Sequence, residues 1–238
     1  MGAENENVAR TGMSASGARP NGSRFMSKSK PDTGRFDDRL SAVYDPKGDK
    51  AKLYDDWAGT YDHDLLDDLG YVAHLDAGAI FVEQVPDRST SILDVACGTG
   101  LVGRFLRQRG YDRIDGVDFS AGMLESVEKR KIYRRTWQHD FTKPAGISEP
   151  YQALICVGLF SYNIPRISDM HNVVDCVEPG GLCVITVNGA AWAELDLESD
   201  LYREAAAHGF TIVEIREAEY IRNENIDARV LVIRREHG

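Results

Sequence analysis

The feature that most constrains the fold is a glycine turn between a short apolar strand and an amphipathic helix. Residues 92–95 form the apolar run, and Gly98 and Gly100 follow it in a turn that bulky residues could not adopt. Apolar residues then recur at helical spacing up to Gly110, which stands where a helix C-cap is expected. A second short strand ends on Asp118. This order of strand, turn, helix, strand and acid predicts a nucleoside-bearing ligand at the carboxyl ends of a parallel sheet.

Two adenosine cofactors fit this order, and Asp94 distinguishes them. Gly98, Gly100 and Gly103 match the glycine pattern of NAD-binding turns, with Asp118 near the expected offset. However, a carboxylate at Asp94 would face the pyrophosphate of NAD, whereas it would attract the ammonium group of S-adenosylmethionine. Asp118 suits either cofactor, because it can accept hydrogen bonds from ribose hydroxyls. We therefore expect S-adenosylmethionine, with an NAD-dependent oxidoreductase as the alternative.

The segments after Asp118 complete a predicted adenine pocket. Ser120 is expected to cap a helix in which Met123 covers one face of the adenine. A third strand is predicted over residues 133–138. It leads into Asp140, which could accept a hydrogen bond from the adenine amino group, and into Phe141, which could pack beside the ring.

The rest of the chain alternates strands and helices. Strands are predicted at 151–157, 182–187, 210–221 and 227–234, and helices at 168–177 and 199–208. The last two strands follow each other without a helix, which predicts one antiparallel edge on an otherwise parallel sheet.

Two helices are predicted before the first strand. The first begins near Lys50 and carries Tyr54, Trp57 and Tyr61 on one face, either as a lid over the cofactor or as a stripe packed into the core. The second is an amphipathic helix packed on the sheet, and the residues of its apolar stripe are Val72, Leu75, Ala79 and Val82.

These motifs resemble the class I S-adenosylmethionine-dependent methyltransferases over residues 50–236. The shared features are the D-x-x-x-G-x-G turn from Asp94, the acids after the second and third strands, and Pro179-Gly180-Gly181 before the fifth strand. Residues 54–62 and 92–102 are similar to the Williams–Beuren syndrome region methyltransferase-like group and its bacterial relatives. The resemblance implies an α/β fold with a seven-stranded, mostly parallel Rossmann-like sheet in the order 3-2-1-4-5-7-6, flanked by helices and covered by an N-terminal helical lid. Tyr151-Gln152 departs from the Phe-Asp often found before the fourth strand in this family, so no role is assigned there.

The predicted division of the chain is a disordered tail at 1–36, a helical cap or lid at 37–86 and a cofactor-binding core at 87–238. The predicted S-adenosylmethionine contacts are Tyr54, Trp57, Tyr61, Asp94, Ala96, Cys97, Gly98, Gly100, Asp118, Phe119, Met123, His139, Asp140, Phe141, Val157 and Gly158.

The acceptor pocket is expected in the loops after the fourth and fifth strands, because ligands of such sheets bind at the carboxyl ends of strands. Its candidate substrate contacts are Phe160, Tyr162, Asn163 and Trp192. An oxygen acceptor would need a base, for which His139 and Tyr162 are the candidates. The first loop lacks the Asn-Pro-Pro-aromatic arrangement of methyltransferases that act on bases or glutamine amides, so a small-molecule acceptor is favoured. Since no base is evident from the sequence, a non-catalytic S-adenosylmethionine-binding protein is a further alternative.

Composition limits the possible partners. The net charge of −10 argues against nucleic acid as substrate, and the basic run at 129–135 is expected to be a solvated helix end. The four cysteines have no metal-binding or disulfide spacing and are expected to be buried free thiols, and no metal site is predicted. No apolar run approaches roughly 18 residues, so we expect no membrane span, a cytoplasmic location, and a monomer or homodimer.

Overall fold

The computed structural model describes Val43, residues 48–162 and residues 165–237. The chain divides into residues 1–33 and residues 34–238, and every described residue belongs to the second unit. The tail predicted at 1–36 therefore lies outside the described residues. Within the described part of the chain, the helices are too short or too polar to cross a bilayer.

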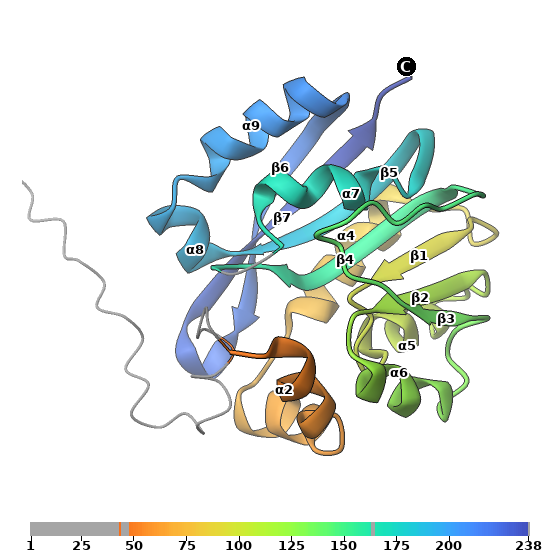
Figure 1. The fold of residues 1–238 in the computed structure, drawn as a ribbon, viewed down its shortest axis with the longest axis vertical. Helices are drawn as coiled ribbons and strands as arrows, with labels where there is room; N and C mark the ends of the chain where they lie inside the picture. Colours follow the sequence, from red (N-terminus) through yellow and green to blue (C-terminus); the bar gives the residue numbers. More distant parts are fainter. Residues whose placement is uncertain (1–42, 44–47, 163–164, 238) are drawn as a thin grey trace, which may run out of the picture. The chain divides into compact units, whose positions relative to one another are not determined.

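A seven-stranded sheet in the order β3-β2-β1-β4-β5-β7-β6 organises the fold (Figure 1), which confirms the predicted strand order. Its strands are β1 (Ile92–Val95), β2 (Ile114–Asp118), β3 (Thr136–Gln138), β4 (Tyr151–Phe160), β5 (Val177–Asn188), β6 (Phe210–Ile221) and β7 (Ile226–Arg235). The ladders from β3 to β5 are parallel, and β7 runs antiparallel to both of its neighbours.

The antiparallel strand β7 lies between β5 and β6, as the predicted strand order requires. Burial explains this position, because Val230, Leu231, Val232 and Ile233 are all fully buried. A strand that is apolar on both faces needs a neighbouring strand on each side and a helix layer on each face. The more polar β6 is exposed at alternate positions and takes the edge.

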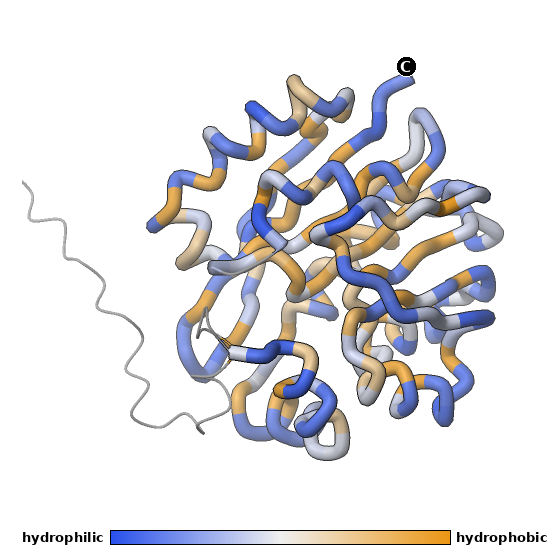
Figure 2. The backbone as a smooth tube through the Cα atoms, in the orientation of Figure 1, coloured by the Kyte–Doolittle hydropathy of each residue, from blue (hydrophilic) through white to orange (hydrophobic). Residues whose placement is uncertain are grey.

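Alternating side chains of the central strands enter two cores. In β4, Leu154 and Cys156 join the first core cluster, whereas Ala153, Ile155 and Val157 join the second. Figure 2 shows the apolar segments concentrated in these strands. The first cluster is covered by α7 (Met170–Val174), α8 (Gly189–Glu194) and α9 (Leu197–His208), and the second by α4 (Ala73–Gln84) and α5 (Leu101–Arg107).

Helix α4 buries a different face from the one predicted. Ala77, Ile80 and Phe81 are buried, whereas Leu75 is 42% exposed. A Cβ placed on Gly78 would lie 2.5 Å from Cε1 of Phe105 in α5. Small residues allow α4 and α5 to approach closely, and this close packing buries the face that carries Ala77 and Phe81.

Three predicted elements have other bounds in the structure than the sequence indicated. The third strand starts at Thr136 and not at residue 133, since Tyr133 turns inward. The helix predicted at 168–177 is a 3₁₀ turn, η3 (Ile167–Asp169), followed by the short α7. Residues 179–181 lie within β5, where they form a bulge, because the pairing with β4 jumps from Val177 to Leu182.

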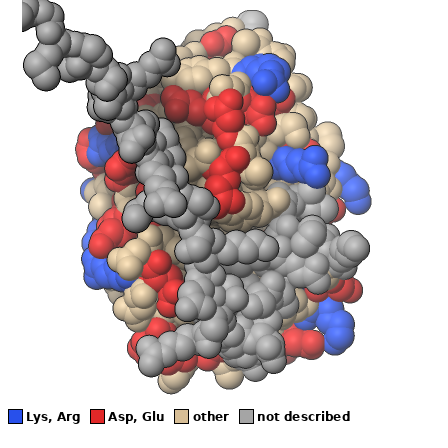
Figure 3. Space-filling view, turned by 90° about the vertical axis from the view of Figure 1, so that its left-hand side faces the viewer, with Lys and Arg blue, Asp and Glu red and all other residues tan. Residues whose placement is uncertain are grey.

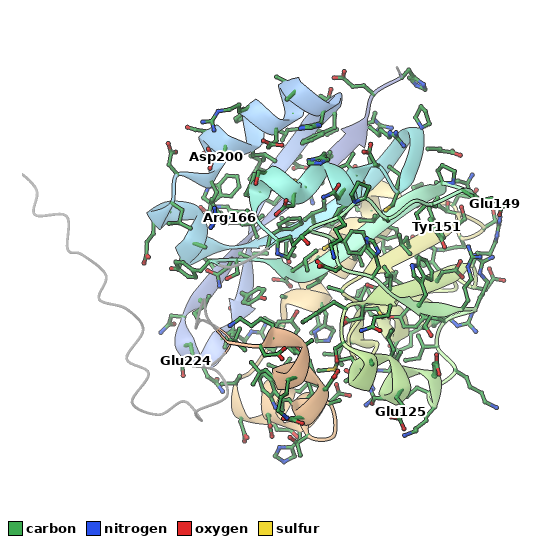
Figure 4. The ribbon with its side chains drawn as sticks, viewed as in Figure 1. Glu125, Glu149, Tyr151, Arg166, Asp200 and Glu224 are labelled. Carbon is green, nitrogen blue, oxygen red and sulfur yellow. The ribbon has the colours of Figure 1, made fainter. Side chains whose placement is uncertain are left out.

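The basic run at 129–135 follows the end of a helix and its basic residues are exposed, as expected, but two of its arginines also bind a buried acid. Helix α6 (Ala121–Glu128) stops before it, and the guanidinium groups of Arg134 and Arg135 bind the fully buried carboxylate of Asp115 at 2.8–3.0 Å. The hydroxyl of Tyr151 donates to the same carboxylate at 2.7 Å. Tyr151 and Glu149 mark this end of the sheet in Figure 4, away from Arg166 beyond the carboxyl end of β4. The arginines thus neutralise a buried acid.

The predicted aromatic helix is broken into three pieces. They are α2 (Lys50–Trp57), α3 (Tyr61–His63) and a π-helical turn, η2 (Asp64–Asp68). The three rings still cluster, because the centroid of Trp57 lies 6.2 Å from that of Tyr54 and 4.9 Å from that of Tyr61. We call residues 48–72 the cap.

Candidate functional site

A cavity of about 470 Å³ lies at the carboxyl ends of β1, β2 and β4, and α2 of the cap contributes to its wall. Thirteen of the predicted cofactor contacts line it, namely Tyr54, Trp57, Tyr61, Ala96, Gly98, Asp118, Phe119, Met123, His139, Asp140, Phe141, Val157 and Gly158. The topology brings them together, since the loops after neighbouring parallel strands emerge on one edge of the sheet.

Asp118 is the central polar group of the cavity. Its Oδ2 accepts from the backbone N–H of Gly98 at 2.8 Å, and its Oδ1 accepts from the N–H of Ser120 at 2.9 Å. Each oxygen keeps a second lone pair for a donor in the cavity. Burial raises the pKa of Asp118, although the backbone hydrogen bonds act in the opposite direction. A carboxylate held in this way is suited to accept hydrogen bonds from a diol.

The glycine turn presents open space to the cavity at Gly98. Gly98 has a φ of +51°, and a Cβ built on it meets no atom within 4 Å. By contrast, a Cβ on Gly100 would lie 2.7 Å from Val127 and from Ile132. The first glycine of the motif therefore faces the ligand space, and the second is required for packing.

Asp94 lies behind this turn and is not part of the cavity lining. Its Oδ2 accepts from the hydroxyl of Tyr133 at 2.5 Å, and burial raises the pKa of Asp94 to about 7. The ring of Tyr133 occupies the space beside Gly103, where a Cβ would lie 2.5 Å from it. Asp94 and Gly103 therefore share a structural role, because Asp94 binds the hydroxyl of Tyr133 and Gly103 leaves room for its ring. The spacing of the sequence did not indicate this contact.

Cys97, the remaining predicted contact outside the lining, packs with Leu124 and Val127. Burial raises the pKa of its thiol well above the ordinary value, so the thiol stays protonated. All four cysteines are free and buried, as predicted.

The wall formed by the segment after β3 combines an acid with aromatic rings. Oδ1 of Asp140 accepts from the N–H of Thr142 at 3.0 Å and from its hydroxyl at 2.9 Å. Burial pushes the pKa of Asp140 upward, but these hydrogen bonds outweigh it and the pKa is lowered. Phe141 is buried beside it, and the ring of His139 meets Phe141 edge to face at 4.8 Å. Nε2 of His139 lies 3.0 Å from the carbonyl oxygen of Lys143. Because a carbonyl only accepts, the neutral ring carries its lone pair on Nδ1.

The three predicted substrate contacts that the structure describes do not line this cavity. Phe160 and Trp192 are buried in the first core cluster, and Tyr162 packs against that cluster from its rim. Asn163 lies outside the described residues. Phe160 ends β4 and Trp192 belongs to α8, and both side chains pack into the core that α7 and α9 cover.

Five further residues of the lining form another part of the wall, and sequence reasoning missed them. They are Leu65, Tyr71, Pro165, Tyr220 and Ile221. Tyr71 pairs with Ile221 in an isolated antiparallel bridge, and the rings of Tyr71 and Tyr220 meet edge to face at 5.4 Å. Residues about 150 positions apart carry no local signal for this contact.

Hydrogen bonds hold the cap on the core at two points. The carboxylate of Asp55 in α2 accepts from the N–H of Gly122 at 2.9 Å and from the hydroxyl of Ser120. Asp62 accepts from the hydroxyl of Thr99 and, at 2.6 Å, from Nη1 of Arg130. Ser120 and Thr99 each directly follow a residue of the cavity lining, Phe119 and Gly98, so cap position and cavity shape are linked.

Comparisons with known proteins agree with this geometry. Residues 92–181 match a family model described as a methyltransferase domain. Methyltransferase-like protein 27 of Homo sapiens is 36% identical over 147 residues, which cover 58% of this chain and 57% of that protein. The match thus spans little more than half the length of this curated relative.

Solved structures share the fold at low sequence identity. A S-adenosylmethionine-dependent methyltransferase from Clostridium acetobutylicum ATCC 824 superposes with a TM-score of 0.59 at 14% identity, covering 77% of this chain and 99% of its own. The [4+2]-cyclase SpnF superposes with a TM-score of 0.55 at 14% identity, covering 68% of this chain and 81% of its own. These likenesses concern the fold, and the cyclase illustrates that the fold alone does not determine the reaction.

Proposed function

We propose that this chain transfers the methyl group of S-adenosylmethionine to a small-molecule acceptor. The match of residues 92–181 to a methyltransferase domain and the similarity to a methyltransferase-like protein support this proposal. The observation that carries the proposal is Asp118. Its two oxygens are oriented by Gly98 and Ser120, and it faces the cavity at the end of β2. A ribose diol is a ligand that matches this pair of acceptors.

The residues around the cavity fit the proposed cofactor. Asp118 would hold the ribose, Asp140 and Met123 would flank the adenine, and the open space at Gly98 admits the chain that joins the ribose to the methionine end. The cofactor would supply a methyl group already activated on a sulfonium. The protein is then left to orient the acceptor and to exclude water, which are its main contributions to an in-line displacement.

The cap supplies water exclusion in this proposal. Tyr54, Trp57 and Tyr61 turn their rings toward the cavity wall, and Trp57 is 4% exposed. Such a cap must open to admit ligands and close before transfer. We therefore assign to it the role of a lid.

The character of the acceptor follows from the wall that sequence reasoning missed. Leu65, Pro165 and Ile221 are apolar, and the hydroxyls of Tyr71 and Tyr220 approach Gly158, where a Cβ would lie 3.8 and 3.4 Å from them. Figure 3 shows acidic side chains gathered in the upper middle of one face of the molecule. The charged groups of the lining itself are mainly acidic, since it contains Asp49, Asp118 and Asp140 beside Lys50. This environment favours a small neutral or cationic acceptor over nucleic acid.

A base is needed only if the acceptor carries a proton that must leave before transfer. His139 lines the cavity, and its Nδ1 holds the lone pair, whereas Tyr162 lies outside the lining. We therefore propose His139 over Tyr162 as the base for such an acceptor.

The experiment that tests the function has two steps. Calorimetric titration with S-adenosylhomocysteine and with NADH comes first, and we expect binding of S-adenosylhomocysteine alone. Incubation with methyl-labelled cofactor and fractionated metabolite pools follows, and we expect label in a small molecule that depends on active protein. Binding of NADH alone would support the oxidoreductase, and cofactor binding without labelled product in any pool would support the non-catalytic alternative.

A further inference from the structure

A cluster of three side chains away from the cavity joins α7 to α9. His171 comes from α7, and Glu204 and His208 occupy positions one helical turn apart in α9. Nδ1 of His171 lies 3.8 Å from Oε2 of Glu204, and Nε2 of His208 lies 3.4 Å from the same oxygen. One nitrogen or oxygen atom from each residue lies within 4.8 Å of the other two.

These separations approach those of a metal site. Two ligands bound to a tetrahedral zinc ion, at the usual bond lengths, lie about 3.4 Å apart. Two imidazole nitrogens and one carboxylate oxygen also form a common ligand set for zinc, with a fourth position left for water. The spacing and the chemistry of the donors therefore point to the same kind of ion.

Two of the donor atoms are buried without a hydrogen bond. Nδ1 of His171 and Oε2 of Glu204 are inaccessible to solvent, and neither has a hydrogen-bond partner among the described residues. Buried polar atoms of native proteins are nearly always partnered, so two such atoms facing each other call for a shared ligand. A cation would satisfy both at once.

We propose that His171, Glu204 and His208 form a binding site for a divalent transition metal, with Zn²⁺ as the ion that fits best. Glu204 is at the centre, because its Oε2 is the atom common to both measured separations. Its side chain is only 17% exposed, whereas that of His208 is 40% exposed and leaves a path for the ion and for a water ligand.

Binding requires one ring to turn. The imidazoles of His171 and His208 are stacked, with centroids 4.0 Å apart and planes at 10°. An ion must lie close to the plane of each ring that binds it, which two parallel stacked rings do not permit. His208 is the last residue of α9 and is followed by Gly209 at a φ of +66°, so its side chain has room to rotate. The cost of breaking the stack predicts a moderate affinity.

A metal ion at this site would link α7 to α9. Helices α7 and α9 both cover the first core cluster, and none of the three ligands lines the cavity. A metal bound only by the folded chain stabilises it by mass action. The site is therefore expected to raise thermal stability and to leave cofactor affinity unchanged, whatever the outcome for the proposed function.

Titration of the full chain with Zn²⁺ and with Co²⁺ tests the site. We expect one equivalent of Zn²⁺ by calorimetry near neutral pH, an increase in melting temperature, and visible absorption of bound Co²⁺ that Zn²⁺ removes. Each of His208→Ala, Glu204→Gln and His171→Ala should weaken Zn²⁺ binding by about tenfold or more, since each removes one ligand. Should His171→Ala fold poorly, the exposed His208 and the isosteric Glu204→Gln still provide the test.

His63→Ala is the matched control. His63, Asp64 and Asp68 form another group with metal-ligand spacing, but Asp64 already accepts hydrogen bonds from Trp57 and Thr60. This variant should bind Zn²⁺ as the unaltered chain does. The proposal is overturned if the unaltered chain shows no saturable binding, if His208→Ala and Glu204→Gln bind as tightly as it does, or if His63→Ala abolishes binding.

Discussion

The carboxylate of Asp55 accepts a hydrogen bond from the backbone N–H of Gly122 across 67 residues of sequence, with an N–O distance of 2.9 Å. Gly122 has no side chain to prevent this contact, since a Cβ there would lie 2.8 Å from the Cα of Asp55. The same carboxylate binds the hydroxyl of Ser120, which also caps α6. Asp55 of the cap thus binds Ser120, whose backbone N–H donates to Asp118.

Replacing Asp55 with alanine should loosen the cap. Hydrogen exchange over residues 50–63 should become faster, and S-adenosylhomocysteine should protect this segment less than in the unaltered chain. Hydrogen bonds to Ser120 and Gly122 lower the pKa of Asp55, so its contribution is present at neutral pH and is lost as pH falls through that lowered pKa. Asp56→Ala is the control, because Asp56 is exposed and pairs with Lys52 of the same helix. Equal exchange in the two variants would show that the contact does not hold the cap.

Asp118→Ala should weaken binding of S-adenosylhomocysteine strongly. Each lost hydrogen bond to a charged acceptor is worth about 1.5–3 kcal/mol, so we expect the dissociation constant to rise by at least about tenfold. Calorimetry measures the affinity, and circular dichroism checks that the fold persists. Asp112→Ala, an exposed acid before β2, should bind normally. A folded Asp118→Ala protein with unchanged affinity would remove Asp118 from the proposed site.

The pH dependence of stability should change in Asp94→Asn. Burial raises the pKa of Asp94 to about 7, so between the unfolded pKa and pH 7 the folded chain keeps a proton that the unfolded chain releases. The free energy of unfolding therefore falls as pH rises through this range, by an amount of order 1 kcal/mol per pH unit from this group. Asparagine removes that slope. Urea titrations at several pH values measure the difference between variant and unaltered chain, and parallel curves would contradict the raised pKa.

Trp57→Ala and Trp192→Ala should differ in which part of the chain they destabilise. Both side chains are buried, but Trp57 belongs to a small cluster in the cap and Trp192 to the first core cluster. Truncating a buried tryptophan costs about 3–5 kcal/mol. We expect Trp57→Ala to speed exchange over residues 50–69 while β1 and β5 stay protected, and Trp192→Ala to lower the global free energy of unfolding. A global loss of the same size in both would mean that the cap unfolds together with the core.

Local patterns were enough to predict much of the cavity lining. Strand, glycine turn, helix and acid are contiguous in sequence, and parallel strands place their following loops on one edge. For this reason Gly98, Asp118, Asp140 and Phe141 were predicted from spacing alone, and the structure puts all four in the cavity lining. The end of α9 and the start of β6 could also be predicted. Gly209 separates a segment with helical periodicity from one with the periodicity of a strand.

Contacts between distant segments could not be read in the same way. Tyr133 decides the role of Asp94, and Phe105 decides which face of α4 is buried, through close packing against glycines elsewhere in the chain. The second wall of the cavity, from Tyr71 and Tyr220, and the cluster of His171 with Glu204 depend on which elements the sheet places side by side. The sequence by itself determined the order of elements and the residues at the strand ends, since these follow from local periodicity. Only the tertiary structure decided which side chains share a space, because packing selects partners by shape and burial and not by their separation along the chain.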